Sequence, residues 1–457
     1  MATTSSPSTR LQEPRVRTAL PGPASAKLLA RQNERESNAR TYPRRLTIAP
    51  RRGVGSYIED VDGNVFIDFL TGAGVLSLGH SHPEVLEAVA RQLPLLTHGL
   101  DFPTEIKDEF ISAQLGMLPT EMQTRTKIGF CGPTGANAVE AALKLCKIAT
   151  GRSEIVAFQG SFHGSTHGAM AVSSLLSQRE GVANTMPGVH FFPYPYPLRG
   201  SLGGEESGLR CLEYFERTLR DPLSGITRPA AVILEVVQGE GGVIPAPTDF
   251  LVGVRRVTRE LDIPLIVDEV QCGCGRSGTW FAFEQHGITP DVIVASKALG
   301  GIGMPIALIL FDERLDVWKP GAHIGTFRGN QLAFAGGVAA LEIINRDRIL
   351  DHVRELGAYA LAMLEEFARE HAIVAQARGS GLMLGIEFAN PATGEPDPAA
   401  AIAVQRAALE RGLIVERGGR HDAVIRLLPP LNVTRRTLDQ ALGILSDAVS
   451  EVAPATG

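Results

Sequence analysis

The sequence contains little cysteine and no long apolar segment. Five cysteines in 457 residues, without paired spacing, give no disulfide framework and favour a reducing, cytoplasmic setting. No run of 18 or more apolar residues occurs, so no membrane-spanning helix is expected. Lys and Arg number 44 against 50 Asp and Glu, a formal charge of −6, whereas a nucleic-acid-binding domain would carry a clustered basic excess. We therefore expect neither membrane nor nucleic acid as a partner.

Metal-ligand patterns are missing as well. His163 and His167 are four residues apart, but Gly164 and Gly168 disfavour a regular helix through this segment. No HExxH or paired-cysteine spacing occurs elsewhere. We interpret these histidines as hydrogen-bonding loop residues and expect no metal site.

Glycine and proline are abundant, at 49 and 29 residues. Only the first 40 or so residues have the composition of a disordered chain, because residues 1–30 are rich in Ser, Thr, Pro and Ala and contain a single acid, Glu13. We expect an arm that is disordered or loosely docked there. An organellar transit peptide, which is also rich in Arg and Ser, is the alternative for this segment.

Short apolar runs alternate with helical patterns through the middle of the chain. The runs at 155–158, 231–234, 265–267 and 292–294 are continuously apolar, which is typical of strands buried on both faces. Helical periodicity between them predicts an α/β fold with a mostly parallel central sheet flanked by helices. The later segments, with long amphipathic helices at 349–370 and 398–411 and short strands at 382–388 and 424–428, predict a smaller α+β domain. The expected division is an arm at 1–40, small-domain parts at 41–85 and 345–457, and a large domain at 86–344.

Three segments carry residues suited to chemistry. The glycine-rich turn at 130–138 lies between a strand and a helix, so the free N–H groups of the helix start can bind a phosphate. Asp268 ends one buried strand, where ligands bind in open α/β sheets. Lys297 follows another buried strand directly, and a lysine in this position can attack a carbonyl group.

Together these three features match the needs of pyridoxal 5'-phosphate. Its phosphate needs a helix N-terminus, its pyridine nitrogen needs an anion, and its aldehyde needs an amine. The chain order of turn, Asp268 and Lys297 brings all three to one edge of the sheet. Each feature alone is also compatible with an ordinary turn, a helix cap or a solvent-reaching lysine.

The chain resembles the class III, fold-type I aminotransferases over roughly residues 40–450. The segments that carry the resemblance are GPTGANAVEAALK, SFHGS, EVVQGEGG, IVDEVQCGCGRSG, SKALGGIG, GTFRGN and RLLPPL. The resemblance implies that Lys297 forms the Schiff base with the cofactor and transfers the proton, and that Asp268 pairs with the pyridinium nitrogen. It assigns the other cofactor contacts to Gly135 and Ala136 at the phosphate, Phe162 and Val270 on the two ring faces, Gln271 at the ring hydroxyl, and Thr326 of the partner subunit.

The resemblance also implies a homodimer and a substrate switch. The contact from Thr326 requires a second copy of the chain to complete each site. Arg426 is expected to bind the α-carboxylate of a substrate such as glutamate. Glu240 is expected to pair with Arg426 when an ω-amino group is presented instead. A surface ion pair is the structural alternative for Arg426.

Within the class, the segments ARTYPRRL, FLTGAGVLSLGHSHPEV, LDFPTEIKDEF and FHGSTHGAM are similar to the diaminobutyrate–2-oxoglutarate branch. This implies interconversion of L-2,4-diaminobutyrate and 2-oxoglutarate with L-aspartate 4-semialdehyde and L-glutamate. Ser165 stands where the 4-aminobutyrate and ornithine branches have Arg, and Ala73 where the ornithine-like branch has Tyr. Both residues disfavour those branches, and Ser165 leaves the contact for the γ-carboxylate of glutamate open.

Three other functions remain as alternatives. One is another class III aminotransferase, of the 4-aminobutyrate, ornithine or acetylornithine type. A second is a pyridoxal-phosphate-dependent aminomutase, which has less need of the pair formed by Glu240 and Arg426. The third is a cofactor-binding fold without catalysis, which the presence of Lys297 disfavours.

Overall fold

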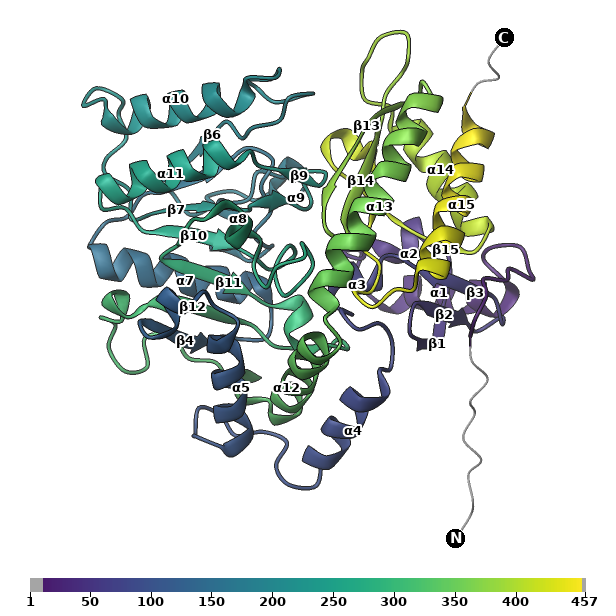
Figure 1. Cartoon of the computed structure of the whole chain (residues 1–457), viewed down its shortest axis with the longest axis horizontal. Coiled ribbons are helices and arrows are strands. Elements are labelled where there is room, and N and C mark those ends of the chain that lie inside the picture. Colours follow the sequence, from purple (N-terminus) through teal and green to yellow (C-terminus); the bar gives the residue numbers. More distant parts are fainter. Residues whose placement is uncertain (1–10, 454–457) are drawn as a thin grey trace.

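The computed structural model describes residues 11–453 and has two unequal parts, which lie side by side in Figure 1. The larger part is built on a sheet that has seven strands among the described residues. In spatial order these are β4 (Thr126–Phe130), β12 (Leu308–Asp312), β11 (Val292–Ala295), β10 (Leu265–Asp268), β7 (Ala231–Leu234), β5 (Ile155–Phe158) and β6 (Val189–Phe192). The pairs from β11 to β6 are parallel, and β12 is antiparallel to both of its neighbours. The predicted α/β fold with a mostly parallel sheet is confirmed.

Alternate residues of the central strands enter different apolar clusters. In β5, Val156 and Phe158 belong to one cluster, whereas Ile155 and Ala157 belong to a second. A strand buried on both faces needs apolar residues at every position, because its side chains alternate between the faces. The helices around this sheet are α5 (Glu105–Gly116), α6 (Thr120–Gln123), α7 (Gly135–Thr150), α8 (His167–Ala171), α9 (Leu176–Arg179), α10 (Ser207–Arg220), α11 (Thr248–Glu260) and α12 (Gln331–Arg346).

The smaller part combines both ends of the chain. One of its sheets has the order β1 (Pro50–Val54), β2 (Tyr57–Asp60), β3 (Val65–Asp68) and β15 (Leu413–Ile414), so a late strand pairs in parallel with an early one. The other has the order β13 (Val374–Ser380), β14 (Met383–Phe388), β17 (Val424–Leu427) and β16 (Glu416–Gly418). Its helices are α1 (Pro23–Arg35), α2 (Tyr42–Arg45), α3 (Thr71–Gly74), α13 (Ile349–Glu370), α14 (Pro398–Glu410) and α15 (Arg435–Val452), with α4 (Pro83–Gln92) packed on α12. The domain limits at residues 40, 85 and 344 stay a prediction.

Where it is described, the N-terminal arm is docked on the smaller part; its residues 1–10 lie outside the described part. Arg15 forms a bridge with Val65, and its N–H donates to the Val65 carbonyl at 2.7 Å. The Asp62 carboxylate accepts hydrogen bonds from the first turn of α1, including the Ser25 N–H at 2.8 Å. The arm is therefore docked through its backbone, because the turn between β2 and β3 supplies acceptors that the composition of the arm does not reveal.

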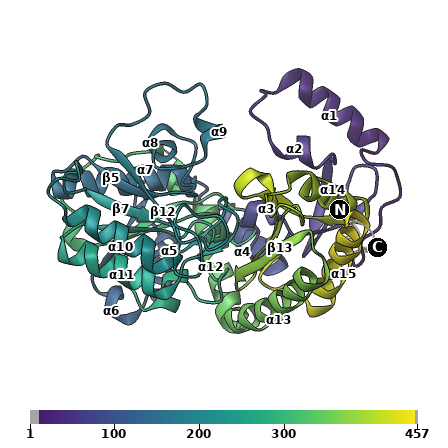
Figure 2. The ribbon, with the colours of Figure 1, turned by 90° about the horizontal axis from the view of Figure 1, so that it is seen from above.

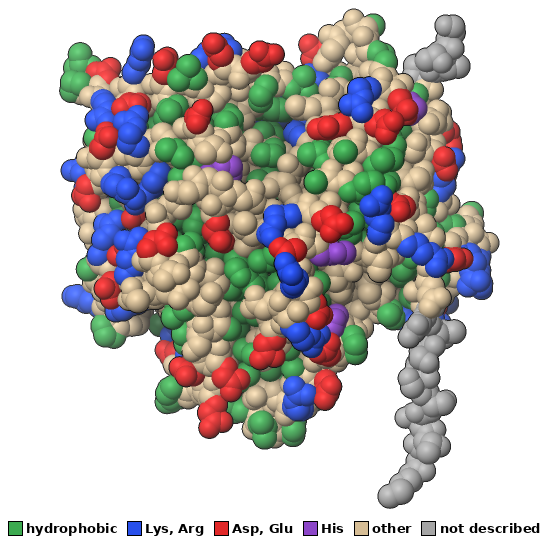
Figure 3. Space-filling view, in the orientation of Figure 1, with side chains coloured by type: hydrophobic (Ala, Val, Ile, Leu, Met, Phe, Trp, Pro, Cys, Tyr) green, Lys and Arg blue, Asp and Glu red, His purple; other side chains and the backbone are tan. Residues whose placement is uncertain are grey.

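The surface has mixed charge on the face shown in Figure 3, where basic and acidic side chains lie among one another. The arm helix α1 lies at the outer edge of the smaller part, beside α2 (Figure 2). Between residues 11 and 453, none of the helices is long and apolar enough to cross a membrane.

Candidate active site

Asp268 and Lys297 lie at the same edge of the large sheet, as the sequence predicts. Asp268 ends β10 and pairs in register with Val294 of β11, and Lys297 follows β11 after one further residue. Both side chains line a cavity of about 140 Å³. Of the predicted site residues, all but Thr326 and Arg426 line this cavity. The carboxyl ends of neighbouring parallel strands thus bring an anion and an amine together.

Lys297 is half-buried, and its backbone conformation is unusual for a lysine. Its φ is 37°, in the left-handed region, which costs a non-glycine residue roughly 1–3 kcal/mol. Burial lowers the pKa of Lys297, and the carboxylates of Glu240 and Glu416 oppose that shift. Burial thus favours the neutral amine, which is the form that acts as a nucleophile and accepts a proton.

Asp268 is held by a histidine and by its own strand end. The buried His163 Nδ1 lies 2.7 Å from Asp268 Oδ2, and the Val270 N–H donates to Oδ1 at 3.0 Å. The Nε2 of His163 is buried and has no hydrogen-bond partner in the described structure. His163 is therefore a loop hydrogen-bonding residue, as interpreted from the sequence, but its partner is the site carboxylate.

The turn before α7 contributes Gly135 and Ala136 to the lining of the cavity. The Thr134 side chain caps the helix by accepting from the Asn137 N–H at 3.2 Å. No hydrogen bond within residues 11–453 uses the N–H groups of Gly135 and Ala136. A Cβ on Gly135 would lie 3.0 Å from Val270 Cγ1, so glycine permits the close approach of these two walls.

Glu235 is a buried carboxylate of the cavity that the sequence analysis did not single out. It accepts hydrogen bonds from the N–H groups of Phe162 and Gly239, both at 2.9 Å. Burial raises the pKa of Glu235 from 4.5 to about 7, and nearby Asp268 adds to the shift. Glu235 thus fixes the backbone of Phe162, whose side chain lines the cavity. The sequence could have indicated Glu235, because it is the first residue of EVVQGEGG, one of the segments that carry the resemblance.

Arg426 lies between two carboxylates. It is fully buried, and its Nη1 and Nη2 donate to Oε1 and Oε2 of Glu240 at 2.8 and 2.9 Å. Glu416 Oε2 lies 3.0 Å from Arg426 Nη2, and the Tyr42 hydroxyl donates to Glu416 Oε1 at 3.2 Å. The predicted pair of Glu240 and Arg426 is thus formed. Glu416 and Tyr42 were missed, although Tyr42 belongs to the quoted segment ARTYPRRL.

The two carboxylates respond differently to burial. Burial alone would raise the pKa of Glu240, but the Arg426 guanidinium outweighs burial and holds the pKa below its ordinary value. Burial raises the pKa of Glu416, and Arg426 opposes that shift only in part. Glu240 is therefore the principal counterion of Arg426.

A second, larger cavity of about 1250 Å³ adjoins the first, and Phe162 and Glu240 line both. It lies between α2 of the smaller part and α9 of the larger part, which face each other in Figure 2. Tyr42, Glu416 and several arginines line it. It therefore gives a polar approach to the amine of Lys297.

Comparison with known proteins shows the family of this chain. The family model described as aminotransferase class-III matches residues 38–449. The chain belongs to the class III aminotransferase family. Class III aminotransferases depend on pyridoxal phosphate, so this cavity is the one in which the cofactor must fit.

This class III aminotransferase has relatives of similar length. It is 50% identical over 431 residues to the diaminobutyrate–2-oxoglutarate aminotransferase of Rhizobium meliloti (strain 1021), covering 92% of each chain. It is 44% identical to the enzyme of the same name from Haemophilus influenzae, covering 90% of this chain and 92% of that one. Among solved structures, a Bacillus anthracis aminotransferase is 25% identical with a TM-score of 0.85, covering 94% and 99% of the two chains. A PLP-bound amine transaminase from an uncultivated Pseudomonas species is 27% identical with a TM-score of 0.83, covering 92% and 98%.

The residues of the aminotransferase cavity fit the cofactor. Gln271 Oε1 is buried without a hydrogen-bond partner in residues 11–453, so a polar atom is still needed beside it. The free N–H groups of Gly135 and Ala136 suit a phosphate, and Asp268 suits a protonated ring nitrogen. Across the described range, no group of three or more His, Cys, Asp or Glu side chains forms a metal site.

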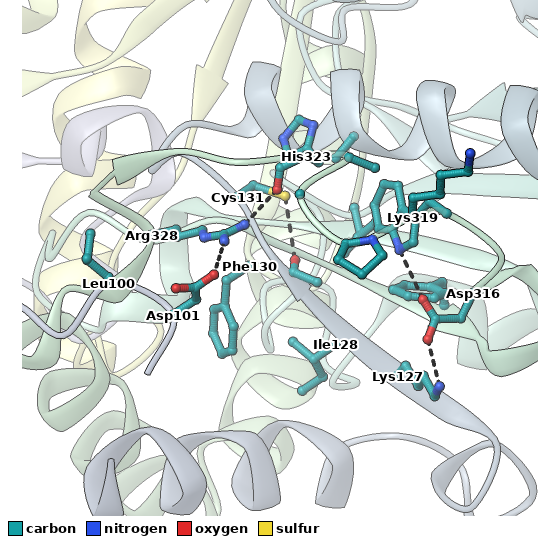
Figure 4. Close-up of a pocket in the computed structure, with 18 of the residues that line it drawn as sticks. Leu100, Asp101, Lys127, Ile128, Phe130, Cys131, Asp316, Lys319, His323 and Arg328 are labelled. Atoms are coloured by element: carbon teal, nitrogen blue, oxygen red, sulfur yellow. Dashed lines mark hydrogen bonds and ion pairs between the residues drawn. The ribbon is translucent and has the colours of Figure 1, made fainter. Parts of the chain in front are cut away.

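Thr326 lies outside this cavity and is exposed. Its loop borders a surface pocket of about 420 Å³, in which Arg328 pairs with Asp101 (Figure 4). Two apolar residues beside Thr326, Ile324 and Phe327, are 74% and 69% exposed. Within one subunit of the aminotransferase, Thr326 therefore contributes no side chain to the cofactor cavity.

Proposed function

We propose that the protein transfers an amino group between L-2,4-diaminobutyrate and 2-oxoglutarate, with L-aspartate 4-semialdehyde and L-glutamate as products. The relatives named for this reaction are similar over about nine-tenths of the chain, which supports the proposal. The observation that carries it is the ion pair between Glu240 and Arg426 beside Lys297. Diaminobutyrate reacts at a carbon without a carboxylate, so it requires Arg426 to be neutralised.

The switch has a simple electrostatic basis. Glutamate carries a carboxylate on its reacting carbon, and a free Arg426 can bind that group bidentately. Glu240 must then move away, because two carboxylates cannot both occupy the same guanidinium edge. In the half-reaction with diaminobutyrate, Glu240 returns and neutralises Arg426, which would otherwise be buried without its principal counterion.

The other residues hold the reacting groups and move the proton. Bound pyridoxal phosphate supplies the aldehyde that takes up the amino group and a ring that delocalises the charge left on the reacting carbon. Lys297 Nζ, whose pKa burial lowers, takes the proton from the reacting carbon of the substrate and returns it. Asp268, oriented by His163, supplies the anion for the ring nitrogen. Phe162 and Val270 would lie against the two faces of the ring, and Gln271 would form a hydrogen bond with the ring hydroxyl.

A homodimer and a cytoplasmic location complete the proposal. Thr326 is exposed beside the apolar residues Ile324 and Phe327, which suits burial against a second copy of the chain. Thr326 of one subunit would contact the phosphate that is bound in the site of the other subunit. The five cysteines are all free and buried, which agrees with a reducing compartment.

The test is a comparison of amino donors. Glutamate formation from 2-oxoglutarate is measured with diaminobutyrate, 4-aminobutyrate and ornithine, and diaminobutyrate is expected to give the highest kcat/KM. A preference for ornithine or 4-aminobutyrate would contradict the proposal. Movement of an amino group within one compound, without consumption of 2-oxoglutarate, would instead identify an aminomutase.

Lys297→Ala tests the mechanism. We expect turnover to fall by at least about 10²- to 10⁴-fold, because the group that transfers the proton is lost. Lys27→Ala, at an exposed lysine of α1, serves as the control and should keep full activity. Undiminished turnover by the Lys297→Ala protein would exclude the assigned role.

A further inference from the structure

Both proposed substrates carry a carboxylate at the same distance from the reacting carbon. In diaminobutyrate, three bonds separate C4, which bears the reacting amine, from the carboxylate carbon C1. In glutamate, three bonds separate C2 from the distal carboxylate carbon C5. One fixed cation could therefore serve both half-reactions, whereas Arg426 is needed in only one of them. This step rests on the function proposed above.

Ser165 does not supply that cation, and its neighbourhood offers no replacement at the same position. Its hydroxyl is exposed and donates to Gln178 Oε1 at 2.9 Å. Ser165 lines neither the cofactor cavity nor the larger cavity next to it. The receptor for the shared carboxylate must come from elsewhere.

Most arginines of the larger cavity already have a carboxylate partner. Arg45 and Arg417 pair with Asp422 at 3.1 and 2.8 Å, and Arg199 pairs with Glu387. Arg420 differs from these three, because no carboxylate in residues 11–453 lies within 4 Å of it. Its Nη1 is buried, and the described structure gives it no hydrogen-bond partner.

Arg420 is also held in place. Its guanidinium carbon lies 4.7 Å from the centre of the Tyr196 ring, so the planar group rests against an aromatic side chain. It begins the short helix η5 (Arg420–Asp422) in the loop between β16 and β17. In the same loop, the Gly419 N–H donates to the Glu240 carbonyl at 3.0 Å. The loop that carries Arg420 is thereby tied to a residue that lines both cavities.

The charges around Arg420 favour an anion. Behind Tyr196, Glu387 accepts from the Tyr196 hydroxyl and pairs with both Arg199 and Arg378. This cluster therefore contains three arginines, including Arg420, and one carboxylate. Arg420 is half-buried and has no carboxylate within 4 Å in residues 11–453, so a substrate carboxylate would reduce the cost of its partial desolvation.

We propose that Arg420 binds the carboxylate that the two substrates have in common. The rival is Arg179, which lines the same cavity and also has no carboxylate partner among the described residues. Its guanidinium carbon lies 5.6 Å from the Phe191 ring centre, and its Nη2 donates to the Thr185 hydroxyl at 3.4 Å. Arg420 is favoured because its Nη1 is buried without a partner and its loop is fixed to Glu240.

The test compares substrates that differ only in the shared carboxylate. 1,3-Diaminopropane is diaminobutyrate without its carboxylate, and 2-aminobutyrate is glutamate without its distal carboxylate. In Arg420→Gln, kcat/KM for diaminobutyrate and for glutamate should fall by about 10- to 100-fold, the range for loss of a charged hydrogen bond. The loss should lie mainly in KM, and kcat/KM for diaminopropane and 2-aminobutyrate should stay within about twofold of wild type. Arg420→Lys keeps the charge and should recover part of the loss.

Arg179→Gln is the matched control, and its kcat/KM for each of the four substrates should equal that of the wild-type protein. A loss in Arg179→Gln without one in Arg420→Gln would overturn the assignment, as would an equal loss for all four substrates in Arg420→Gln. Thermal unfolding and the absorbance of the bound cofactor show whether each variant is folded. If the wild-type protein fails to use diaminobutyrate, the proposed function fails, but the comparison of glutamate with 2-aminobutyrate still tests Arg420.

Discussion

Two carboxylates, those of Glu240 and Glu416, lie beside the buried guanidinium of Arg426. Glu240 binds both of its terminal nitrogens, and Glu416 lies 3.0 Å from one of them. If Glu240 moves aside as proposed, Glu416 remains beside the guanidinium and still accepts from the Tyr42 hydroxyl. The buried arginine would then keep a carboxylate neighbour through both half-reactions, which limits the cost of the proposed switch.

Glu235 provides a pH-dependent prediction at the same scale. Because burial raises its pKa from 4.5 to about 7, the folded protein retains a proton that the unfolded chain releases above pH 4.5. This contribution to stability is complete below pH 4.5 and is lost as the pH rises to about 7. Relative to Glu235→Gln, the wild-type free energy of unfolding should fall by about 3 kcal/mol across that window. Denaturant unfolding of both proteins at several pH values measures the difference.

A second buried carboxylate with a raised pKa does not affect the comparison of wild-type protein with Glu235→Gln. Burial also raises the pKa of Glu269 to about 7, but Glu269 is present in both proteins and cancels in the difference. A difference in stability that does not vary between pH 4.5 and 7 would show that Glu235 is ionised in the folded protein throughout.

Residues were predictable from the sequence where the strand order alone brings them together. Asp268 and Lys297 end neighbouring parallel strands, so their meeting follows from the topology. The contact of His163 with Asp268 spans 105 residues, and that of Tyr42 with Glu416 spans 374. Such pairs depend on how separate loops pack, and no local pattern in the sequence encodes that packing.

Helix α7 offers a prediction at the scale of one element. Thr134→Ala removes its N-cap and should lower the free energy of unfolding by about 1 kcal/mol. It should also weaken pyridoxal phosphate binding, because the cap fixes the turn that presents the N–H groups of Gly135 and Ala136. Thr434→Ala removes the equivalent cap of α15, away from the cavity, and should reduce stability alone. Cofactor titration and denaturant unfolding separate the two effects; equal cofactor affinity in both variants would contradict the role of the cap.

Helices and strands with a clear hydrophobic pattern were predicted with nearly the bounds that the structure shows. The helix expected at 349–370 coincides with α13, and the apolar runs at 155–158 and 231–234 coincide with β5 and β7. The arm helix α1 was not expected, because its side chains are mostly exposed and carry little apolar periodicity. Its first turn is held by Asp62, a residue that the local pattern assigns only to a turn.

The whole assembly can be tested by mixing subunits. If Thr326 serves the partner's site, a mixed dimer of Lys297→Ala and Thr326→Ala subunits contains one site with both native residues. We expect such mixtures to regain part of the wild-type activity, although each variant alone is impaired. If Thr326 acts within its own subunit, no site in the mixed dimer is intact and activity should not rise above the average of the two variants.

The segment from β16 to β17 groups three residues that we assign to substrate binding. Lys297 and Asp268 are encoded in the middle of the chain, whereas Glu416, Arg420 and Arg426 lie within 11 consecutive residues near its end. Under the proposed roles, an exchange within these 11 residues would change the contacts to the substrate and leave Asp268 and Lys297 as they are. Substrate preference would then depend largely on one segment that is contiguous in the sequence, together with Glu240.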